Sequence, residues 1–418
     1  MKKLSRLAES MVGSEIVRLG NEINERKRRG ENIFNFTIGD FDPNIFPIPE
    51  AFEELIIKCY KEHYTNYPAA EGIIELRQAV SAFLKEWMQL DYSPSEILIA
   101  SGGRPLIYTL FKTVVDDNDK VIYAAPSWNN NHYTNLHKGK HCVIEAKPEN
   151  NFMPTANDIA ANIKDAALIC LCTPQNPTGT TLSKETLSAI CDLVIEENNR
   201  RSKDEKKLYV MFDQIYWTLT YGDVKHYNPV SQNAEMRDYT IFIDGISKAF
   251  AATGVRVGWA FGPVEVLAKM KAFLSHIGAW APMAEQHATA KYLPEKELVQ
   301  QHFYEFKTQL QQRLNKIYDG LIALKHDGFN IDAIAPQAAI YLTVKFDFVG
   351  KKFDDILLKS QEDVTEYLLS NAHLAVVPFY AFGAEKKSPW YRLSVGTCKL
   401  NDIPLFLQQL KNALKELL

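Results

Sequence analysis

A lysine and an arginine follow an apolar, strand-like run in the segment TIFIDGISKAFAATGVRVGW, which covers residues 240–259. Lys248 comes just after the turn that ends this run, and Arg256 follows it in a second turn rich in small residues. A lysine amine can attack a carbonyl carbon, and a neighbouring arginine can hold an anion. Taken alone, however, Lys248 also fits a surface lysine at a strand-to-helix turn, so other residues must decide between the two interpretations.

Unusual residues also stand at the ends of three earlier apolar runs. Gly102 and Gly103 lie where a predicted strand turns into a helix, and free backbone amides at a helix start can hold a phosphate. An ordinary turn is the alternative there. Asn176 lies in the proline-flanked turn PQNPTG. Asp213 ends the apolar run KLYVMFD, where a carboxylate is costly unless a cation meets it, and Tyr216 follows closely.

In an open α/β sheet, ligands bind just outside the carboxyl ends of the strands, so these residues are expected to meet at one edge. Pyridoxal phosphate chemistry needs such a set. It requires a lysine that forms an imine, a carboxylate that keeps the pyridine nitrogen protonated, and an arginine with a glycine turn for the phosphate. The combination therefore predicts a pyridoxal phosphate site.

The elements that must position these residues follow from the hydrophobic pattern. From about residue 96, near-continuous apolar strands alternate with helices, which indicates an α/β fold with a mostly parallel sheet covered on both faces. A long helix with one apolar stripe is predicted over 295–325; it crosses between two domains, with a coiled coil as the alternative. Further helices are predicted over 4–30, 50–62, 72–87, 183–197, 361–372 and 402–417, and a short strand over 33–38.

The chain of 418 residues exceeds one ordinary core, so two domains are expected. We assign residues 1–48 to an N-terminal arm and part of a small domain. Residues 49–298 form the large domain that carries the cofactor site. Residues 299–418, beginning with the interdomain helix, form the small α+β domain.

Composition excludes several classes of protein. The net charge of -4 argues against nucleic acid as a partner. No apolar stretch reaches the length of a membrane span, and the N-terminus lacks a signal-peptide core, which favours the cytoplasm. Six cysteines are too few for a disulfide scaffold. Cys170 and Cys172 could form half of a metal site, but no partner pair follows at zinc spacing, so no metal is expected.

The chain resembles the class I/II aminotransferases of the aspartate aminotransferase superfamily, which are fold type I pyridoxal phosphate enzymes. The resemblance runs from about residue 15 to the C-terminus. It rests on the N-P-T-G turn, D-x-x-Y, S-K-x-F-x-x-T-G-x-R-x-G and the late Y-R-L-S, in that order. It implies an aminotransferase that moves an amino group from an amino acid to a 2-oxo acid in a ping-pong cycle.

The resemblance also implies roles for individual residues. Lys248 would be the Schiff-base lysine and then the base that moves a proton between Cα and the cofactor's C4′ carbon. Asp213 would pair with the pyridinium nitrogen. Tyr216 and Asn176 would hydrogen-bond the phenolate oxygen of the ring. Trp128 would stack on the ring, although a core tryptophan is the alternative for that residue alone.

The remaining implied contacts concern the phosphate and the substrate. Arg256, with Gly102, Gly103, Arg104 and Ser247, would hold the phosphate. Arg392 would bind the substrate α-carboxylate as a bidentate pair, with Gly39 closing over it and Asn176 beside it. Tyr67 would reach the phosphate of a neighbouring subunit, which implies a homodimer with shared active sites.

Departures from the family pattern leave the substrate open. Gly245 stands where many relatives have a hydroxyl for the phosphate. Arg104 follows the phosphate turn, where some relatives carry a lysine that meets the distal carboxylate of acidic substrates. It therefore either selects aspartate, glutamate or another dicarboxylate, or only adds charge near the phosphate. Trp280 and Phe41 favour an apolar or aromatic side chain instead.

Two other functions share this cofactor site. A β-eliminating lyase is the closer alternative, but such relatives often carry histidine where this chain has Tyr216. A non-enzymatic regulator that binds pyridoxal phosphate is the remote alternative, because only about 30 residues precede the first predicted strand. The sequence does not identify the donor, the acceptor or the pathway.

Overall fold

The computed structural model describes residues 4–11, 13 and 15–417. Its central sheet has seven strands in the order β2 (Ile97–Ala100), β8 (Gly258–Phe261), β7 (Thr240–Gly245), β6 (Tyr209–Asp213), β5 (Ala166–Cys172), β3 (Lys120–Ala125), β4 (Lys140–Glu145). The neighbouring strand pairs β7–β6, β6–β5, β5–β3 and β3–β4 are parallel, whereas β8 runs antiparallel to both β2 and β7. The predicted, mostly parallel sheet is confirmed.

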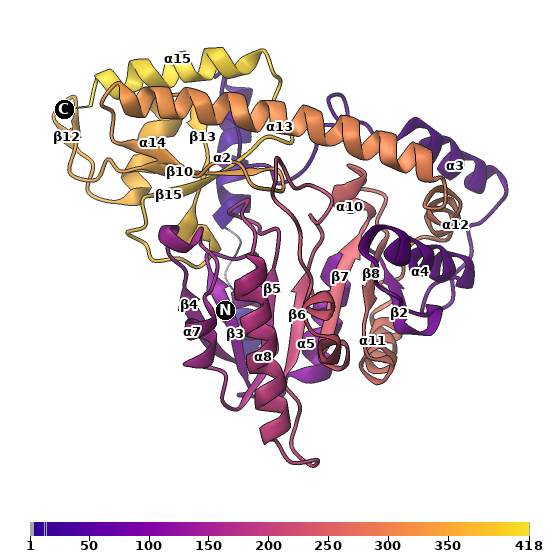
Figure 1. The fold of residues 1–418 in the computed structure, drawn as a ribbon. Helices are drawn as coiled ribbons and strands as arrows, with labels where there is room; N and C mark the ends of the chain where they lie inside the picture. The colour runs from indigo at the N-terminus through magenta and orange to yellow at the C-terminus, as the bar shows by residue number, and fades with distance from the viewer. Residues whose placement is uncertain (1–3, 12, 14, 418) are drawn as a thin grey trace.

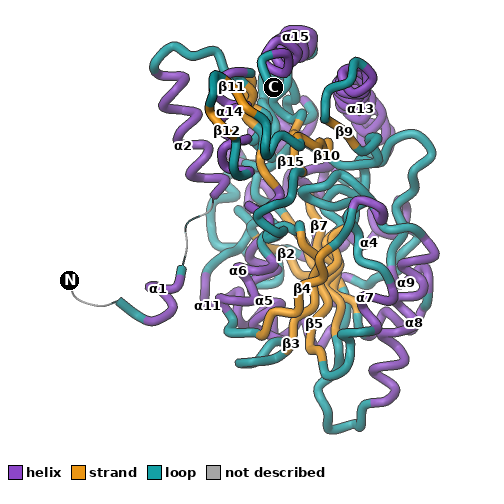
Figure 2. The backbone as a smooth tube through the Cα atoms, turned by 90° about the vertical axis from the view of Figure 1, so that its left-hand side faces the viewer, coloured by secondary structure: helices purple, strands orange, loops and turns teal. Residues whose placement is uncertain are grey.

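Helices cover both faces of this sheet (Figure 2). One face carries α5 (Gly103–Val114), α6 (Asn130–Leu136) and α11 (Val264–Ile277). The other carries α4 (Ile74–Met88), α7 (Ala156–Ala160), α8 (Lys184–Arg200) and α9 (Pro229–Gln232). Because both faces are covered, every residue of β2, β7 and β8 is buried, which explains their continuous apolar runs.

A smaller unit is built around the antiparallel sheet β14 (Val377–Pro378), β15 (Trp390–Ser394), β10 (Tyr341–Phe346), β9 (Ile331–Ala333). Helices α14 (Gln361–Asn371) and α15 (Asp402–Lys415) belong to it, as does the hairpin of β11 (Lys352–Phe353) and β12 (Ile356–Leu357). The N-terminal segment joins this unit, because β1 (Phe34–Asn35) pairs in parallel with β13 (Leu374–Ala375).

The long helix α13 (Lys296–His326) agrees with the helix predicted over 295–325 and extends from the small unit to α3 (Glu50–Lys61) and α12 (Met283–Tyr292) (Figure 1). Val299 and Phe303 pack into the core of the large sheet, and Phe306 to Leu324 pack into the core of the small unit. The apolar stripe is thus buried within this chain, which removes the reason to infer a coiled coil.

Two predictions at the N-terminus are wrong in part. The helix expected over 4–30 is two helices, α1 (Arg6–Ser10) and α2 (Glu15–Arg28), because the backbone is extended at Met11; residues 12 and 14 lie outside the described residues. The strand expected over 33–38 is limited to β1. After Asn35 the chain turns, since its side-chain oxygen accepts hydrogen bonds from the amide and the hydroxyl of Thr37.

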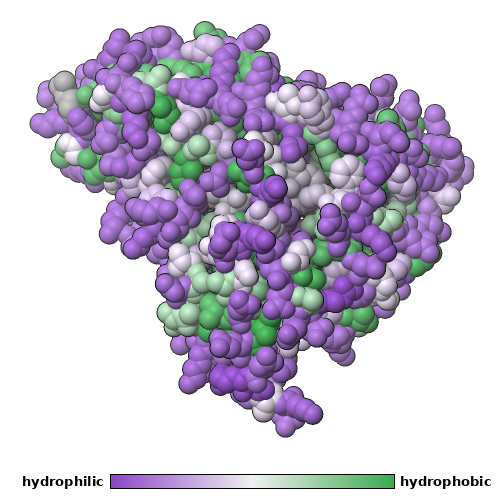
Figure 3. Space-filling view, viewed as in Figure 1, coloured by the Kyte–Doolittle hydropathy of each residue, from purple (hydrophilic) through white to green (hydrophobic). Residues whose placement is uncertain are grey.

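The surface is mostly hydrophilic on the face seen in Figure 3, with hydrophobic side chains in small clusters. Within the part of the chain that the structure describes, no helix is long and apolar enough to cross a membrane. The same residues contain no group of three or more His, Cys, Asp or Glu side chains that could hold a metal ion. Cys170 and Cys172 are free thiols.

Candidate active site

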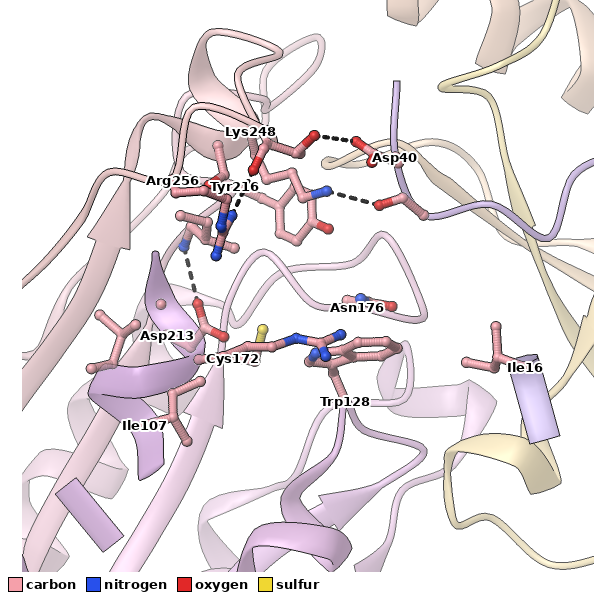
Figure 4. A pocket seen from close by; sticks show the side chains of 18 of the residues that line it. Ile16, Asp40, Ile107, Trp128, Cys172, Asn176, Asp213, Tyr216, Lys248 and Arg256 are labelled. Carbon is pink, nitrogen blue, oxygen red and sulfur yellow. Dashed lines mark hydrogen bonds between the residues drawn. The ribbon is translucent and has the colours of Figure 1, made fainter. Parts of the chain in front are cut away.

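A cavity of about 570 Å³ lies at the carboxyl ends of β5, β6 and β7, between the large sheet and the small unit (Figure 4). The N-terminal segment and β15 close it from the other side through Gly39 and Arg392. The structure brings most of the sequence-predicted site residues into its lining: Gly39, Gly103, Arg104, Trp128, Asn176, Asp213, Tyr216, Ser247, Lys248, Arg256 and Arg392.

Lys248 lies on the short helix α10 (Ile246–Ala249), directly after β7. Its Nζ donates a hydrogen bond to the carbonyl oxygen of Gly39 at 2.8 Å. Burial lowers the pKa of Lys248 to about 8, the nearby arginines add to this effect, and the Asp40 carboxylate opposes it. An amine with a pKa near neutrality can serve as both nucleophile and base.

Gly245 precedes this helix at a place that has no room for a side chain. A Cβ on Gly245 would lie 2.7 Å from Cα of Gly258 and 2.8 Å from the carbonyl oxygen of Val257. A side chain at position 245 would therefore clash with the backbone at Val257 and Gly258. Ser247, two residues on, is buried and lines the cavity.

Asp213 ends β6, lines the cavity and lacks a salt-bridge partner among the described residues. Burial raises the pKa of Asp213 to about 6, while hydrogen bonds from the amide of Ile215 (3.2 Å to Oδ1) and from the thiol of Cys172 lower it. Cys172 lies beside it in register on β5. A carboxylate that has no salt-bridge partner and little contact with water can accept a hydrogen bond from a cationic N–H group. Asp213 therefore fits a pyridinium nitrogen.

Tyr216 and Asn176 approach the cavity from two loops and contact residues of the small unit. The phenol oxygen of Tyr216 lies 2.6 Å from that of Tyr341 on β10. Burial raises the pKa of Tyr216 well above its ordinary value, so the phenol remains a proton donor. Asn176 accepts a hydrogen bond at 3.1 Å from Nη1 of Arg392, which leaves the amide NH₂ of Asn176 for another partner.

Arg392 is 1% exposed, and its guanidinium is held on several sides. Nη2 donates to the carbonyl oxygen of Thr37 at 2.6 Å, and the guanidinium carbon lies 4.8 Å from the ring centres of both Tyr341 and Phe382. Its Nε has no hydrogen-bond partner within the described part of the chain. A buried cation with an unused donor is suited to a carboxylate ligand.

The glycine turn and Arg256 form the opposite end of the cavity. Gly102, at φ 89°, precedes α5, and a Cβ there would overlap the guanidinium of Arg256. That guanidinium donates to the carbonyl oxygens of Ser101 and Thr253, at 2.6 Å each. The amides at the start of α5 and the fixed arginine together make a cradle for a phosphate.

Charge in the cavity is mainly positive. Lys248, Arg104, Arg256 and Arg392 line it, against the carboxylates Asp40 and Asp213. Arg104 lies over the ring of Trp128, with its guanidinium carbon 5.3 Å from the ring centre. This distribution suits a ligand that carries a phosphate together with a substrate that carries a carboxylate.

Two sequence-predicted site residues do not line the cavity. Gly102 lies just behind it, against Arg256. Tyr67 is 83% exposed, and its ring contacts Trp280 with ring centres 5.4 Å apart. Trp280 and Phe41 are also outside the lining. Phe41 packs against Phe46 and Phe306, and Nζ of Lys248 lies 5.5 Å from the centre of its ring.

Sequence reasoning did not identify Cys172 and Thr253, which line the cavity, or three further residues of the site. Tyr341 holds the phenol of Tyr216, and Thr37 holds Arg392. Asp40 lines the cavity, where its Oδ1 accepts a hydrogen bond from the hydroxyl of Thr253 at 2.6 Å. The only signal for Asp40 in the sequence is its place beside Gly39.

The family model of aminotransferase class I and II matches residues 31–410. The aspartate aminotransferase of Bacillus sp. (strain YM-2) is 28% identical over 91% of this chain and 92% of its own length. A probable aspartate/prephenate aminotransferase of Rickettsia felis is 29% identical over 89% and 87%.

Solved structures give the same result for the fold. The aspartate aminotransferase of Rhizobium meliloti superimposes with a TM-score of 0.90 over 100% of both chains, at 24% identity. A double mutant of the Thermus thermophilus aspartate aminotransferase gives a TM-score of 0.87 at 26% identity, over 99% of this chain and 100% of that one. The chain therefore belongs to the class I and II aminotransferases and is a pyridoxal-phosphate-dependent aminotransferase of fold type I.

Proposed function

We propose that this aminotransferase uses Lys248 as its catalytic amine and that aspartate or glutamate is its amino donor. The observation that carries the proposal is the placement of Lys248. Its amine has a pKa lowered to about 8 by burial, and it shares one cavity with Asp213, Asn176 and the two arginines Arg256 and Arg392. Each of these groups supplies a different part of one cofactor and substrate site.

The cavity fits pyridoxal phosphate. When bound, this cofactor supplies a carbonyl carbon that takes the amino group and a ring that withdraws electrons from the substrate Cα. Asp213 would accept a hydrogen bond from the ring nitrogen and keep it protonated. Tyr216 and Asn176 would donate to the ring oxygen. Trp128 would cover the ring.

The phosphate would be held at the glycine turn. Arg256 and the amides that follow Gly102 would bind it, with the hydroxyl of Ser247 as a further donor. Arg104 begins next to these amides in the first turn of α5. Binding of the phosphate by these groups would fix the position of the cofactor ring relative to Lys248.

Proton transfer would occur at Nζ of Lys248. The amine of Lys248 faces the carbonyl of Gly39, which packs beside Arg392. If Arg392 and Gly39 hold the α-carboxylate, the substrate Cα would be directed toward Nζ of Lys248, which would take up and return the Cα proton. The low pKa leaves part of the amine neutral at pH 7 to 8, as a base must be.

An acidic donor is supported by Arg104. No salt bridge joins this guanidinium to an acidic side chain in the described residues; it only covers Trp128 at the cavity. Trp280 and Phe41, which favoured an apolar substrate in the sequence, lie outside the lining. The relatives named as aspartate and aspartate/prephenate aminotransferases agree with a substrate that carries a distal carboxylate.

We further propose a cytoplasmic homodimer with shared sites. Tyr67 is exposed and outside the cavity of its own chain, and α1 projects away from the body of the molecule (Figure 2). Both features support contacts with a second copy, in which Tyr67 would reach the phosphate of the partner's site. Within the chain, the proposed division is an arm at 1–48, a large domain at 49–298 and a small domain at 299–418.

Replacement of Lys248 tests the assignment. We expect Lys248→Ala to lower kcat by roughly 10⁴-fold or more and to remove the absorbance band of the lysine-linked cofactor. The exposed residue Lys269 provides a control, and Lys269→Ala should keep the wild-type rate. Wild-type transamination by Lys248→Ala would contradict the proposal.

A second experiment distinguishes amino transfer from elimination. With glutamate alone, the enzyme should release about one 2-oxo acid per site. Continuous release of pyruvate from cysteine would instead favour a β-eliminating lyase.

A further inference from the structure

A second cavity, of about 590 Å³, lies away from the active site. It is a groove between α4, the middle of α13 and the segment 217–222, which follows the catalytic-site residue Tyr216. Its volume is close to that of the active-site cavity, and volumes of this size are typical of small-molecule sites.

Three aromatic rings form its apolar wall. The ring of Phe303 on α13 lies 5.3 Å from that of Trp87 on α4 and 6.4 Å from that of Trp217, measured between ring centres. Trp87 and Trp217 are both partly exposed at the groove. A flat apolar group could lie against these rings at a small cost in entropy, since the rings are packed on the core.

One cationic side chain, Lys307, also lines this groove. Lys307 is half-buried in the groove, burial lowers its pKa, and no acidic side chain among the described residues pairs with it. The lining contains no aspartate or glutamate. A half-buried ammonium without a carboxylate favours an anionic ligand, and the lack of acidic groups disfavours a ligand that also carries an ammonium.

The groove also holds an unused hydrogen-bond donor. Thr218 lines it and is 7% exposed, yet its hydroxyl oxygen has no hydrogen-bond partner in the described structure. Buried hydroxyl groups are nearly always paired. The hydroxyl of Thr218 lies just beneath the groove lining, where a rotation of the side chain would bring it to a ligand in the groove. A carboxylate that accepts from both Lys307 and Thr218 would satisfy the two groups together.

We infer that this groove is a binding site for a small aromatic carboxylate. The ring lies against Trp87, Trp217 and Phe303, and the carboxylate accepts hydrogen bonds from Lys307 and Thr218. The site is separate from the cofactor cavity, although Trp217 directly follows Tyr216 and so places the ligand one residue from the active-site wall.

The probe is 4-fluorobenzoate, and its binding to the holoenzyme is followed by fluorine NMR. We expect a dissociation constant of about 1 mM or tighter, as is usual for a ligand of this size. Lys307→Ala should weaken binding by about tenfold, and Thr218→Val should also weaken it, because each removes a donor to a charged group. Thr218→Ser, which keeps the hydroxyl, should bind as the wild type does.

Two control variants separate this site from others. Lys316 is an exposed lysine on α13 outside the groove, so Lys316→Ala should leave the affinity unchanged. Arg392→Ala alters the active site and should also leave it unchanged. The inference is overturned if the wild type does not bind the probe, if Lys307→Ala and Thr218→Val bind it normally, or if Arg392→Ala abolishes binding.

Discussion

The phenol oxygens of Tyr216 and Tyr341 are 2.6 Å apart, and this hydrogen bond joins the loop after β6 to strand β10 of the small unit. Both rings are buried. If Tyr216 donates its proton to the ring oxygen of the cofactor, Tyr341 must donate to Tyr216. Tyr341 is then a positioning residue, which orients a group that contacts the cofactor without touching the cofactor itself.

Tyr341→Phe should therefore lower kcat by about fivefold, the effect of one lost hydrogen bond of about 1 kcal/mol. Tyr216→Phe should have a larger effect. In the Tyr216→Phe background the second substitution should change little, because the group that it orients is gone. Steady-state kcat of the two single variants and the double variant checks this. Effects that multiply independently would show that the two phenols do not act as a unit.

Arg104 should determine selectivity between acidic and aromatic donors. We expect Arg104→Ala to lower the ratio of the half-reaction rate constant to the Kd for aspartate by about 10- to 100-fold. This corresponds to the loss of a charged hydrogen bond. For phenylalanine the change should be under about threefold. Stopped-flow absorbance of the cofactor measures both. Arg104→Lys should keep part of the preference for aspartate, whereas equal losses with both donors would contradict the role.

The glycine turn should be sensitive to a single methyl group. Gly102 has φ 89°, and a Cβ there would overlap Arg256, so Gly102→Ala must strain the backbone and displace the guanidinium. We expect cofactor affinity to fall about tenfold or more, as costs of 1–3 kcal/mol imply. Gly20→Ala in α2, where no atom lies within 4 Å of the added Cβ, is the control. Fluorescence titration with pyridoxal phosphate measures the cofactor affinity of both variants. Equal affinities of Gly102→Ala and Gly20→Ala would contradict the steric argument.

The parts of the site that lie on the large sheet could be predicted from the sequence. Asp213 ends one buried strand and Lys248 follows another, and parallel strands bring their carboxyl ends to one edge, so the local pattern is sufficient. The same reasoning predicted α13 to within one residue at each end, since a long single stripe is a strong signal.

Residues supplied by distant segments could not be found in this way. Thr37 and Asp40 reach the site because Phe34 pairs with Leu374, a contact that no local pattern encodes. Tyr341 enters the site because β10 and β15 pair in the small unit, where Tyr341 lies opposite Ser394. Such placements depend on packing between elements far apart in the chain, so the geometry was needed to identify them.

Asp244 should make stability depend on pH. It is fully buried at the end of β7 and accepts hydrogen bonds from the amide of Gly245 at 2.7 Å and from Gln214 at 3.4 Å. Burial raises the pKa of Asp244 to about 8. In the unfolded chain its pKa returns to about 3.9. Between these values the folded protein keeps a proton that the unfolded chain has released.

The free energy of unfolding should consequently fall as pH rises from about 4 to about 8, with a slope of about 1.4 kcal/mol per pH unit from this group. Asp244→Asn resembles the protonated carboxyl and does not titrate. Its melting temperature relative to the wild type should therefore be higher at pH 8.5 than at pH 5. Asp204→Asn, at an exposed aspartate, should show the same difference at both pH values. If Asp244→Asn also shows a constant difference, the carboxyl of Asp244 is already ionised in the folded protein at pH 5.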